Sequence, residues 1–451
     1  MQEHRTMARR LGEHAVVVGA GIGGLAAAGA LAASFERVTV LERDDLPRSA
    51  GSRAGTPQDR HPHVLLAGGL KALGSLFPGI ENDLGKAGAI RVGIAKEVRW
   101  ERPGIGVLPA QDCGLSVLCA SRPLTEHTLR RRVAALDNVE LWPGARVTEI
   151  ALATGDAGVR AVRFELGRGG PQTLAGDLVV DASGRGVLAL AALDSLGWDR
   201  PPATEIGVDI RYASVVVRIP SGSPYASSII LTQPDPPALA SNAVILPVEG
   251  NDWIVGLAER GVGARPGDWP SFLAALRGLS TPTLHEVLRH AEPPAEIRHY
   301  GFPASVWRHF ERMPRLPRGL LPIGDSICRF NPVYGQGMSA AAMQARLLQD
   351  ALEQATGADP LAAAQASFMA AIPSVLETPW TMAAAGDFAF PGTRGERPDG
   401  FEDGQRFEAA LFRAAATDPV VHRTLHEVIH LLRPRGDLQD REIRRRIEAV
   451  V

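Results

Sequence analysis

Apolar positions near the start of the chain predict a strand–helix–strand unit. His14–Gly19 is a short run rich in β-branched residues that ends in glycine, which is typical of a buried parallel strand. Gly23–Ala33 has the pattern of a helix of small residues, and Arg37–Glu42 that of a second strand. Together the three segments predict a βαβ unit with a glycine-rich turn between its first strand and its helix.

Later segments continue this alternation, and one region interrupts it. A helix is predicted to begin after Ser121, followed by strands at 145–150, 162–166, 178–181 and 320–324 and a long helix at 339–353. Within the interruption, Ala243–Pro247 and Trp253–Ala258 flank the turn 249–251 and predict an antiparallel hairpin. We therefore predict a doubly wound α/β nucleotide domain with an inserted antiparallel β-sheet domain.

The predicted domain limits follow from these patterns. The nucleotide domain is discontinuous and takes residues 14–95, 115–204 and 296–375. The inserted domain takes residues 96–114 with 205–295, and residues 376–451 form a helical carboxyl-terminal region containing a Gly/Pro/charge-rich loop at 386–404.

Composition narrows the class of protein. The 451 residues are 45% hydrophobic and 22% charged, with a net charge of −2, which is typical of a globular protein with no nucleic-acid partner. The three cysteines share no metal-site or disulfide spacing, so we expect no metal. Met1–His14 is charged and lacks the apolar core of a signal peptide. With no 18-residue apolar stretch, we expect no membrane span and a cytoplasmic location.

The glycines after the first strand match a dinucleotide fingerprint. Gly19-Ala20-Gly21-Ile22-Gly23-Gly24 supplies GxGxxG between a strand and a helix. Gly19 permits the tight turn, Gly21 lets the backbone approach a pyrophosphate, and Gly24 allows close helix packing. Glu42 ends the second strand, where a carboxylate accepts both ribose hydroxyls of an ADP moiety. The fingerprint predicts ADP and does not choose between NAD and FAD.

A second glycine-rich segment lies near residue 330. Asp325 follows a predicted strand and is placed to bind a ribityl hydroxyl. Gly335 and Gly337 permit a turn that brings the next helix's N–H groups against a ligand. The positive end of that helix would stabilise negative charge on a reduced flavin. Together with the first fingerprint, this segment favours FAD.

The chain resembles the single-component FAD-dependent aromatic hydroxylases of the p-hydroxybenzoate hydroxylase type. The resemblance implies a Rossmann-like FAD domain of the glutathione-reductase type, with Arg122 at the FAD phosphates, Val147 at the adenine edge and Asp181 in an Asp-Gly type motif. The FAD-contacting positions that it implies together with the fingerprints are Gly19, Gly21, Ile22, Gly23, Gly24, Glu42, Arg43, Arg53, Arg122, Val147, Asp181, Asp325, Pro332, Gly335, Gln336, Gly337 and Met338.

The chain is more closely similar to the flavin epoxidases of polyether antibiotic biosynthesis, those acting on monensin and lasalocid precursors. The most distinctive stretch is Arg53–Leu66, and the likeness also includes Thr378-Pro379-Trp380. In that stretch Arg53, Gln58 and Arg60 are candidates for contact with flavin or substrate, or for bracing the loop. His61 and His63 would share a face in a strand, and without a third ligand we expect packing or pocket lining rather than a metal. We expect Trp380 to be a core aromatic.

The resemblance implies an FAD-dependent monooxygenase. It would insert one oxygen atom from O₂ into a hydrophobic natural product, free or carrier-protein bound, through a flavin C4a-hydroperoxide, giving an epoxide or a hydroxylated arene. We expect the inserted sheet to line a hydrophobic pocket with Val208, Ile210, Ile245 and Val255. Only one dinucleotide fingerprint is present, so electrons come from transiently bound NAD(P)H or from a separate flavin reductase.

Three alternatives stay open. A reductase or dehydrogenase of the geranylgeranyl reductase type would use the same fold. A flavin halogenase would need a catalytic lysine, whereas Lys71 has the pattern of a solvated helix residue and the Trp-x-Trp-x-Ile-Pro pattern is missing. A non-enzymatic FAD-binding or redox-sensing protein would bind flavin without O₂-coupled turnover.

Overall fold

A parallel sheet forms one end of the molecule. In the computed structural model, which describes residues 10–153, 158–167, 169–261 and 265–450, five parallel strands have the order β17-β11-β1-β2-β7. The strands are β1 (Gly12–Val18), β2 (Phe35–Leu41), β7 (Val139–Trp142), β11 (Leu178–Asp181) and β17 (Leu320–Pro322). The order places β1 in the centre, with its carboxyl end and those of β2 and β11 at one edge, where such sheets bind ligands.

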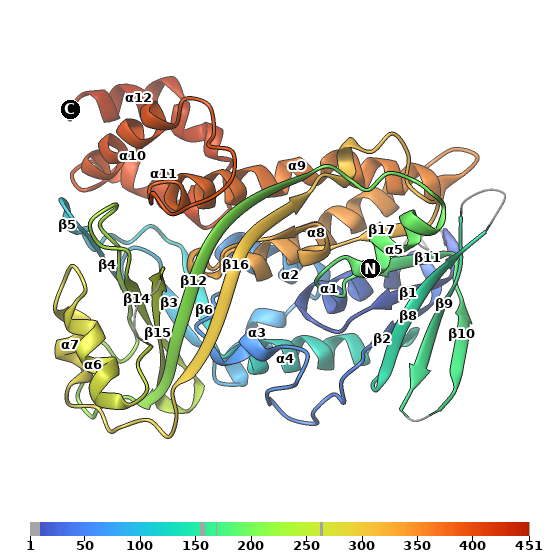
Figure 1. Cartoon of the computed structure of the whole chain (residues 1–451), viewed down its shortest axis with the longest axis horizontal. Helices are drawn as coiled ribbons and strands as arrows, with labels where there is room; N and C mark the ends of the chain where they lie inside the picture. The colour runs from blue at the N-terminus through green and yellow to red at the C-terminus, as the bar shows by residue number, and fades with distance from the viewer. Residues whose placement is uncertain (1–9, 154–157, 168, 262–264, 451) are drawn as a thin grey trace, which may run out of the picture.

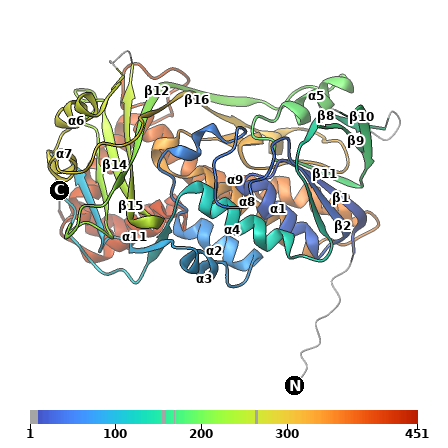
Figure 2. The same cartoon turned by 90° about the horizontal axis from the view of Figure 1, so that it is seen from below.

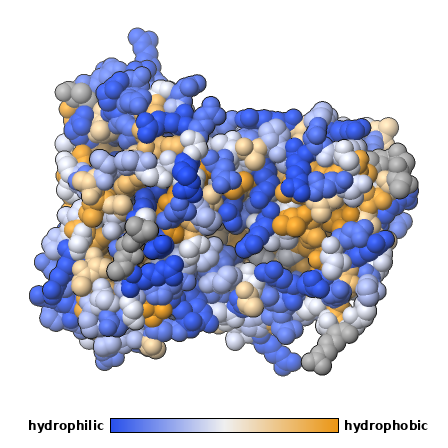
Figure 3. Space-filling model, viewed as in Figure 1, coloured by the Kyte–Doolittle hydropathy of each residue, from blue (hydrophilic) through white to orange (hydrophobic). Residues whose placement is uncertain are grey.

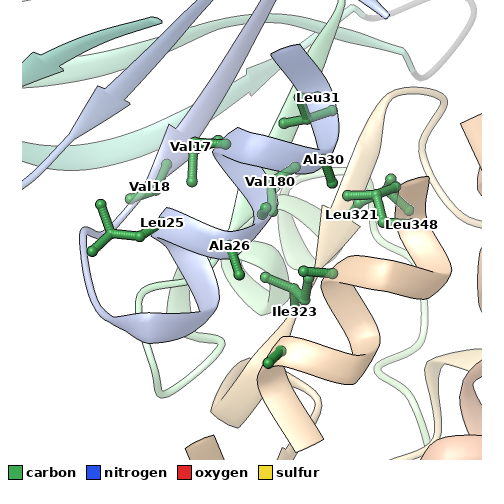
Figure 4. Close-up of a cluster of buried hydrophobic side chains, with 14 of the residues drawn as sticks. Val17, Val18, Leu25, Ala26, Ala30, Leu31, Val180, Leu321, Ile323 and Leu348 are labelled. Carbon is green, nitrogen blue, oxygen red and sulfur yellow. The ribbon is translucent and has the colours of Figure 1, made fainter. Parts of the chain in front are cut away.

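Helices α1 (Ile22–Ala32) and α8 (Gly337–Glu353) pack together against this sheet. Figure 4 shows the contact, in which Ala26 of α1 lies near Ile323, and Ala30 lies near Leu321 and Leu348. Small residues on α1 allow close approach: a Cβ on Gly24 would lie 1.9 Å from the carbonyl oxygen of Gly19. The core therefore holds both predicted ligand-binding helix starts at one edge of the sheet.

Further strands and helices surround this core. A three-stranded antiparallel sheet and a two-stranded one flank it. These strands are β8 (Ala145–Leu152), β9 (Val159–Leu166), β10 (Pro171–Ala175), β3 (Ile90–Gly93) and β6 (Ser116–Cys119). The helices are α2 (Ala67–Leu76), α3 (Ile80–Lys86), α4 (Arg122–Ala134) and α5 (Val187–Ser195).

An eight-stranded sheet forms the opposite end, and Figures 1 and 2 show helices α1, α2, α4 and α8 between the two ends. Its order is β18-β16-β12-β15-β14-β13-β4-β5, antiparallel except where β4 pairs with β13. Its strands are β4 (Val98–Arg102), β5 (Gly106–Val107), β12 (Ala203–Arg218), β13 (Ile229–Thr232), β14 (Asn242–Val248), β15 (Asp252–Arg260), β16 (Arg298–Arg308) and β18 (Cys328–Arg329). Helices α6 (Trp269–Arg277) and α7 (Thr283–Leu288) cover its outer face.

Four helices complete the chain: α9 (Pro360–Asp387), α10 (Phe401–Ala415), α11 (Pro419–Ile429) and α12 (Arg441–Glu448). Helices α10 to α12 pack on Trp100 of β4. Helix α9 continues through residues 375 and 376, so the predicted domain division, which stays a prediction, falls inside a helix. No helix among the described residues is long and apolar enough to cross a membrane.

The fold class is confirmed, and several local predictions need correction. The predicted loop at 386–404 is shorter, because α9 ends at Asp387 and α10 begins at Phe401. His61 and His63 follow the short 3₁₀ helix η1 (Pro57–Arg60) rather than lying in a strand. Part of the amino-terminal segment, where no signal peptide was expected, lies outside the described residues.

The predicted hydrophobic pocket is also wrong at the four named positions. Ile245 and Val255 are fully buried in the cluster beneath α6 and α7, on the outer face of the sheet. Val208 and Ile210 pack against Phe388 at the end of α9. Alternation along a strand predicted which residues are buried, but not that helices from elsewhere fill both faces.

Candidate functional site

The turn between β1 and α1 has the shape of a phosphate-binding loop. Gly19 adopts φ +105°, a conformation that favours glycine, and lies against the Ala182 backbone. A Cβ on Gly21 would meet only Arg53, 4.0 Å away, so the space above this residue is open. Helix α1 begins at Ile22 with no side-chain cap, which leaves backbone donors for an anion.

Glu42 and Arg53 form the centre of a buried charged cluster beside this turn. Glu42 accepts hydrogen bonds from the Ala20 amide at 2.7 Å and the Asp44 amide at 3.0 Å. The Arg53 guanidinium lies 3.2 Å from Glu42, 2.8 Å from Asp44 and 2.7 Å from Glu126. Despite the desolvation of burial, these carboxylates raise the pKa of Arg53. Glu42, the carboxylate predicted to bind the ribose, and Arg53, the first residue of the 53–66 stretch, are thus held together.

Arg122 and Asp325 lie in the next part of the site. Arg122 is the first residue of α4, whose cap Ser121 accepts from the Leu124 amide. Its guanidinium lies 3.4 Å from Nε2 of His63, and burial lowers the pKa of His63 to about 3. Burial raises the pKa of Asp325, while Arg122, Arg329 and Arg308 lower it. A neutral imidazole and a carboxyl group among arginines suit a phosphate or polyol ligand.

The segment before α8 forms a tight turn at the third part of the site. Asn331 caps the 3₁₀ helix η5 (Pro332–Tyr334), and Gly335 then adopts φ +64°. A Cβ on Gly335 would lie 2.7 Å from Val64, so this turn packs on the 53–66 stretch. Helix α8 begins at Gly337 with no side-chain cap, and a Cβ on Gly337 would meet nothing within 4 Å. Its first N–H groups are available to a ligand.

The inner face of the eight-stranded sheet presents aromatic and polar groups to the 53–66 stretch. His61 bonds through Nδ1 to the Ser214 hydroxyl at 2.7 Å, and its ring lies 6.2 Å from Tyr212 and 5.6 Å from Tyr300. Burial lowers the pKa of His61 to about 4. His61 is therefore a neutral histidine beside two tyrosine rings, on the face of the sheet that is turned toward the 53–66 stretch.

A cleft of about 320 Å³ opens between this face and the 53–66 stretch. It is lined by Ser214, Val216 and Ile254 of the sheet, by Arg60 and Asp59, and by Glu296 and Arg298, among others. Arg60 and Arg298 both pair with Glu296. Gln58 is half-buried in η1, and its carbonyl accepts from the His61 amide. Of the two catalytic candidates, Arg60 is the one that lines this cleft.

Other predicted positions have varied surroundings. Arg43 is exposed, and Val147 is partly buried on β8, near the Ala145 amide that donates to the carbonyl of Glu42. The Asp181 carboxylate is fully buried and accepts from Ser183, Ala189 and Ser326, so its oxygens hold the turn after β11. Lys71 is exposed on α2. The expectation for Trp380 is confirmed, because it packs against Trp307 and Phe330.

Sequence reasoning missed several residues around the site. Glu126, Tyr212, Arg260, Tyr300 and Asp387 carry no local motif, and each comes from a different element. Glu126 had one weak signal, since it follows Arg122 at the i,i+4 spacing of a helical ion pair. The others are brought in only by tertiary structure.

The residues fit an extended dinucleotide such as FAD. Open space lies above Gly21 and Gly337, at two uncapped helix starts. Four buried polar atoms of the site region have no hydrogen-bond partner among the described residues: Arg122 Nε, Glu126 Oε2, Arg329 Nε and Gln336 Oε1. Buried polar groups are normally satisfied, so unpaired donors and acceptors in this region suit a ligand with phosphates and hydroxyls.

Comparisons with known structures give the same architecture. Residues 17–70 match the NAD(P)-binding Rossmann-like domain. A flavoprotein/dehydrogenase from Cytophaga hutchinsonii superposes with a TM-score of 0.66 at 14% identity, over 97% of this chain and 98% of that one. PqsL of Pseudomonas aeruginosa, described as a probable FAD-dependent monooxygenase, gives 0.60 at 16% identity, over 84% and 97%. The flavin-dependent brominase Bmp2 gives 0.60 at 15%, over 97% and 94%. The chain therefore shares the fold of these flavoproteins.

A sequence relative then defines the family. Protein Rv3254 of Mycobacterium tuberculosis (strain ATCC 25618 / H37Rv) is 34% identical over 444 residues, covering 91% of this chain and 87% of the relative. The chain belongs to the same family as Protein Rv3254.

Proposed function

We propose that the protein is an FAD-dependent monooxygenase that transfers one oxygen atom from O₂ to an organic substrate. The observation that carries the proposal is that contacts through Arg53 and Glu126 connect the open turn at Gly21 to the Arg122–Asp325 region, while the turn before the uncapped start of α8 packs on the same 53–66 stretch. The fold of the flavoprotein monooxygenases supports the same assignment.

The chain's own residues would hold and orient the cofactor. Glu42 would accept the ribose hydroxyls, the α1 amino terminus would bind the pyrophosphate, and Asp325 a ribityl hydroxyl. The start of α8 would stabilise negative charge on the pyrimidine edge of the flavin. FAD, when bound and reduced, would supply the two electrons that activate O₂. The protein would exclude water and place the substrate. We assign no catalytic side chain; Gln58 and Arg60 remain candidates.

The substrate we propose is a hydrophobic molecule that carries a polar group. The cleft beside His61 combines apolar Val216 and Ile254 with Ser214, Arg60 and Arg298. Alkene epoxidation and aromatic hydroxylation both suit such a substrate, whether free or carried on a protein. The proposed electron donor is NAD(P)H, bound transiently, or a separate flavin reductase.

Stopped-flow oxidation tests the proposal. The purified protein is loaded with FAD, reduced anaerobically and mixed with oxygenated buffer. Absorbance is followed at wavelengths shorter than the visible absorption band of the oxidised flavin. A near-ultraviolet transient that precedes reoxidation, and ¹⁸O from ¹⁸O₂ in the product of a polyene or arene, would support a monooxygenase. Direct reoxidation with every substrate would instead favour a reductase, and a chloride- or bromide-dependent product a halogenase. Failure to bind FAD would overturn the proposal.

Anaerobic mixing with nicotinamide cofactors separates the two electron sources. If NADH or NADPH bleaches the bound flavin within the turnover time, the chain reduces its own cofactor. If only an added flavin reductase restores product formation, the chain depends on a partner.

A further inference from the structure

A buried polar cluster joins the end of α9 to the turn before α8. Asp387, the last residue of α9, has a fully buried side chain. Its Oδ1 accepts hydrogen bonds from Asn331 Nδ2 at 2.8 Å and from the Tyr334 hydroxyl at 3.0 Å. Both donors belong to the segment that leads into Gly335 and the start of α8. One carboxylate oxygen therefore holds that segment at two points.

The inserted sheet holds the same segment from the other side. The side-chain oxygen of Asn331 accepts from the Tyr212 hydroxyl at 2.8 Å and from the Val333 amide at 3.2 Å. The Val333 amide also lies 3.1 Å from the Tyr212 oxygen. Asn331, which is fully buried, is thus clamped between Tyr212 of β12 and Asp387 of α9.

Close packing leaves the end of α9 little freedom to move. A Cβ on Gly386 would lie 2.3 Å from the Tyr334 hydroxyl, so the helix backbone and this side chain are in direct contact. Arg260 of β15 donates to Asp387 Oδ1 at 2.5 Å, and its guanidinium lies 4.4 Å from the centre of the Phe390 ring. The cluster therefore joins the eight-stranded sheet, α9 and the turn before α8 in one network of contacts.

The charge of the cluster is balanced and shielded from water. Burial raises the pKa of Asp387, while Arg260, Asn331 and Tyr334 lower it. Asp387 Oδ2 and Arg260 Nη1 are buried without a partner among the described residues. A buried ion pair of this kind is weak support for stability but specifies one arrangement of its neighbours.

We propose that Asp387 is a positioning residue for the cofactor site, which fixes the 331–337 turn and hence the start of α8 relative to bound flavin. The inference rests on the proposed function and extends it to a residue that is not among the predicted cofactor contacts. Asp387 acts through Asn331 and Tyr334. Substitution of Asp387 should therefore alter flavin affinity and reduction potential by loosening the turn, although no predicted flavin-contacting residue is itself substituted.

Three variants test this role. Asp387→Ala removes the acceptor, and Asp387→Ala/Arg260→Leu also removes the charge that would otherwise be left buried and unpaired. Asp359→Asn is the matched control, since Asp359 caps the opposite end of α9, pairs with exposed Arg318, and asparagine caps equally well. The readouts are hydrogen exchange of residues 331–340 in the flavin-free protein, the FAD dissociation constant and the flavin midpoint potential.

We expect both Asp387 variants to exchange faster at 331–340 and to bind FAD about tenfold more weakly. Their midpoint potential should be more negative, because the reduced flavin loses the field of α8, whereas Asp359→Asn should match the wild type. Folded Asp387 variants with wild-type exchange and potential would overturn the inference. Wild-type protein that binds no FAD would overturn the proposed function and the cofactor role of Asp387, while the exchange data would still decide whether the clamp exists.

Discussion

Gly21, the N-cap of α1, and Gly24, inside α1, lie three residues apart, yet they face different surroundings. A Cβ on Gly21 would touch only Arg53 at 4.0 Å, and its φ of −75° suits any L residue. A Cβ on Gly24 would lie 1.9 Å from the Gly19 carbonyl oxygen. We predict that Gly21→Ala leaves unfolding by urea within about 0.5 kcal/mol of wild type but weakens FAD binding at least about tenfold. Gly24→Ala should instead destabilise the protein before any ligand is added. Equal loss of stability in both variants would contradict this assignment.

Arg53 carries a second prediction at this scale. Its side chain is 5% exposed and faces the carboxylates of Glu42, Asp44 and Glu126. Arg53→Met would leave three acidic groups without their shared cation, and we expect a loss of about 3–5 kcal/mol in the free energy of unfolding. Arg43→Met is the control, because Arg43 is 63% exposed and should cost under about 0.5 kcal/mol. Urea titrations of both variants at pH 7 measure the difference; a stable Arg53→Met would show that the cluster is not held by charge.

At the scale of elements, local pattern predicted most helices and strands but not their partners. The βαβ unit, the β14–β15 hairpin and the start of α8 follow from glycine positions and hydrophobic runs. Glu42 and Asp325 were found because strand ends of a parallel sheet meet at one edge. Ile245 and Val255 were assigned to the wrong face, because burial alone does not say which helix covers a strand. Asp387 could not be found, since its three partners are distant in sequence.

Helix α11 contains His422 and His426, and His430 follows at its C-cap, so that this element has three histidines at i, i+4 and i+8 and a stability that depends on pH. His422 and His426 join through their Nε2 atoms at 3.0 Å, and His426 packs on Trp100. Burial, with the neighbouring histidines, lowers the pKa of His426 to about 3, and burial lowers that of His430 to about 4. A histidine whose folded pKa lies below its unfolded value of 6.5 stabilises fully only above pH 6.5. Stability is therefore lost as the pH falls from 6.5 toward 3.

We expect a stability loss of about 2 kcal/mol from His426 alone between pH 7 and pH 5. His426→Leu should remove this share of the pH dependence and leave the slope due to His430, His61 and His63. Substitution of His290, exposed beyond the end of α7, should leave the profile unchanged. Urea midpoints across this range provide the measurement. If His426→Leu retains the wild-type slope, the titration responsible lies elsewhere.

At the scale of the whole molecule, strands β12 and β16 connect the two ends, and the two ends also meet at α4. Glu249, in the turn between β14 and β15, accepts hydrogen bonds from the Ser121 amide at 2.9 Å and from the Ser121 hydroxyl. Ser121 caps the helix that begins with Arg122, so the eight-stranded sheet contacts the element that carries the arginine proposed to bind the cofactor. The position of the sheet and the position of Arg122 are therefore coupled through one carboxylate.

Glu249→Ala should loosen this contact without disturbing either core. We expect a stability loss of about 1 kcal/mol, because the half-buried Ser121 amide loses its acceptor, and a several-fold weaker affinity for FAD. Limited proteolysis should cut the β14–β15 turn faster in the variant, and added FAD should slow the cut again, since a ligand that binds only the folded arrangement stabilises it by mass action. Glu286→Gln, on exposed α7, is the control. If FAD slows proteolysis of the turn in neither protein, the cofactor site and the inserted sheet are independent. The coupling through Ser121 would then have to be abandoned.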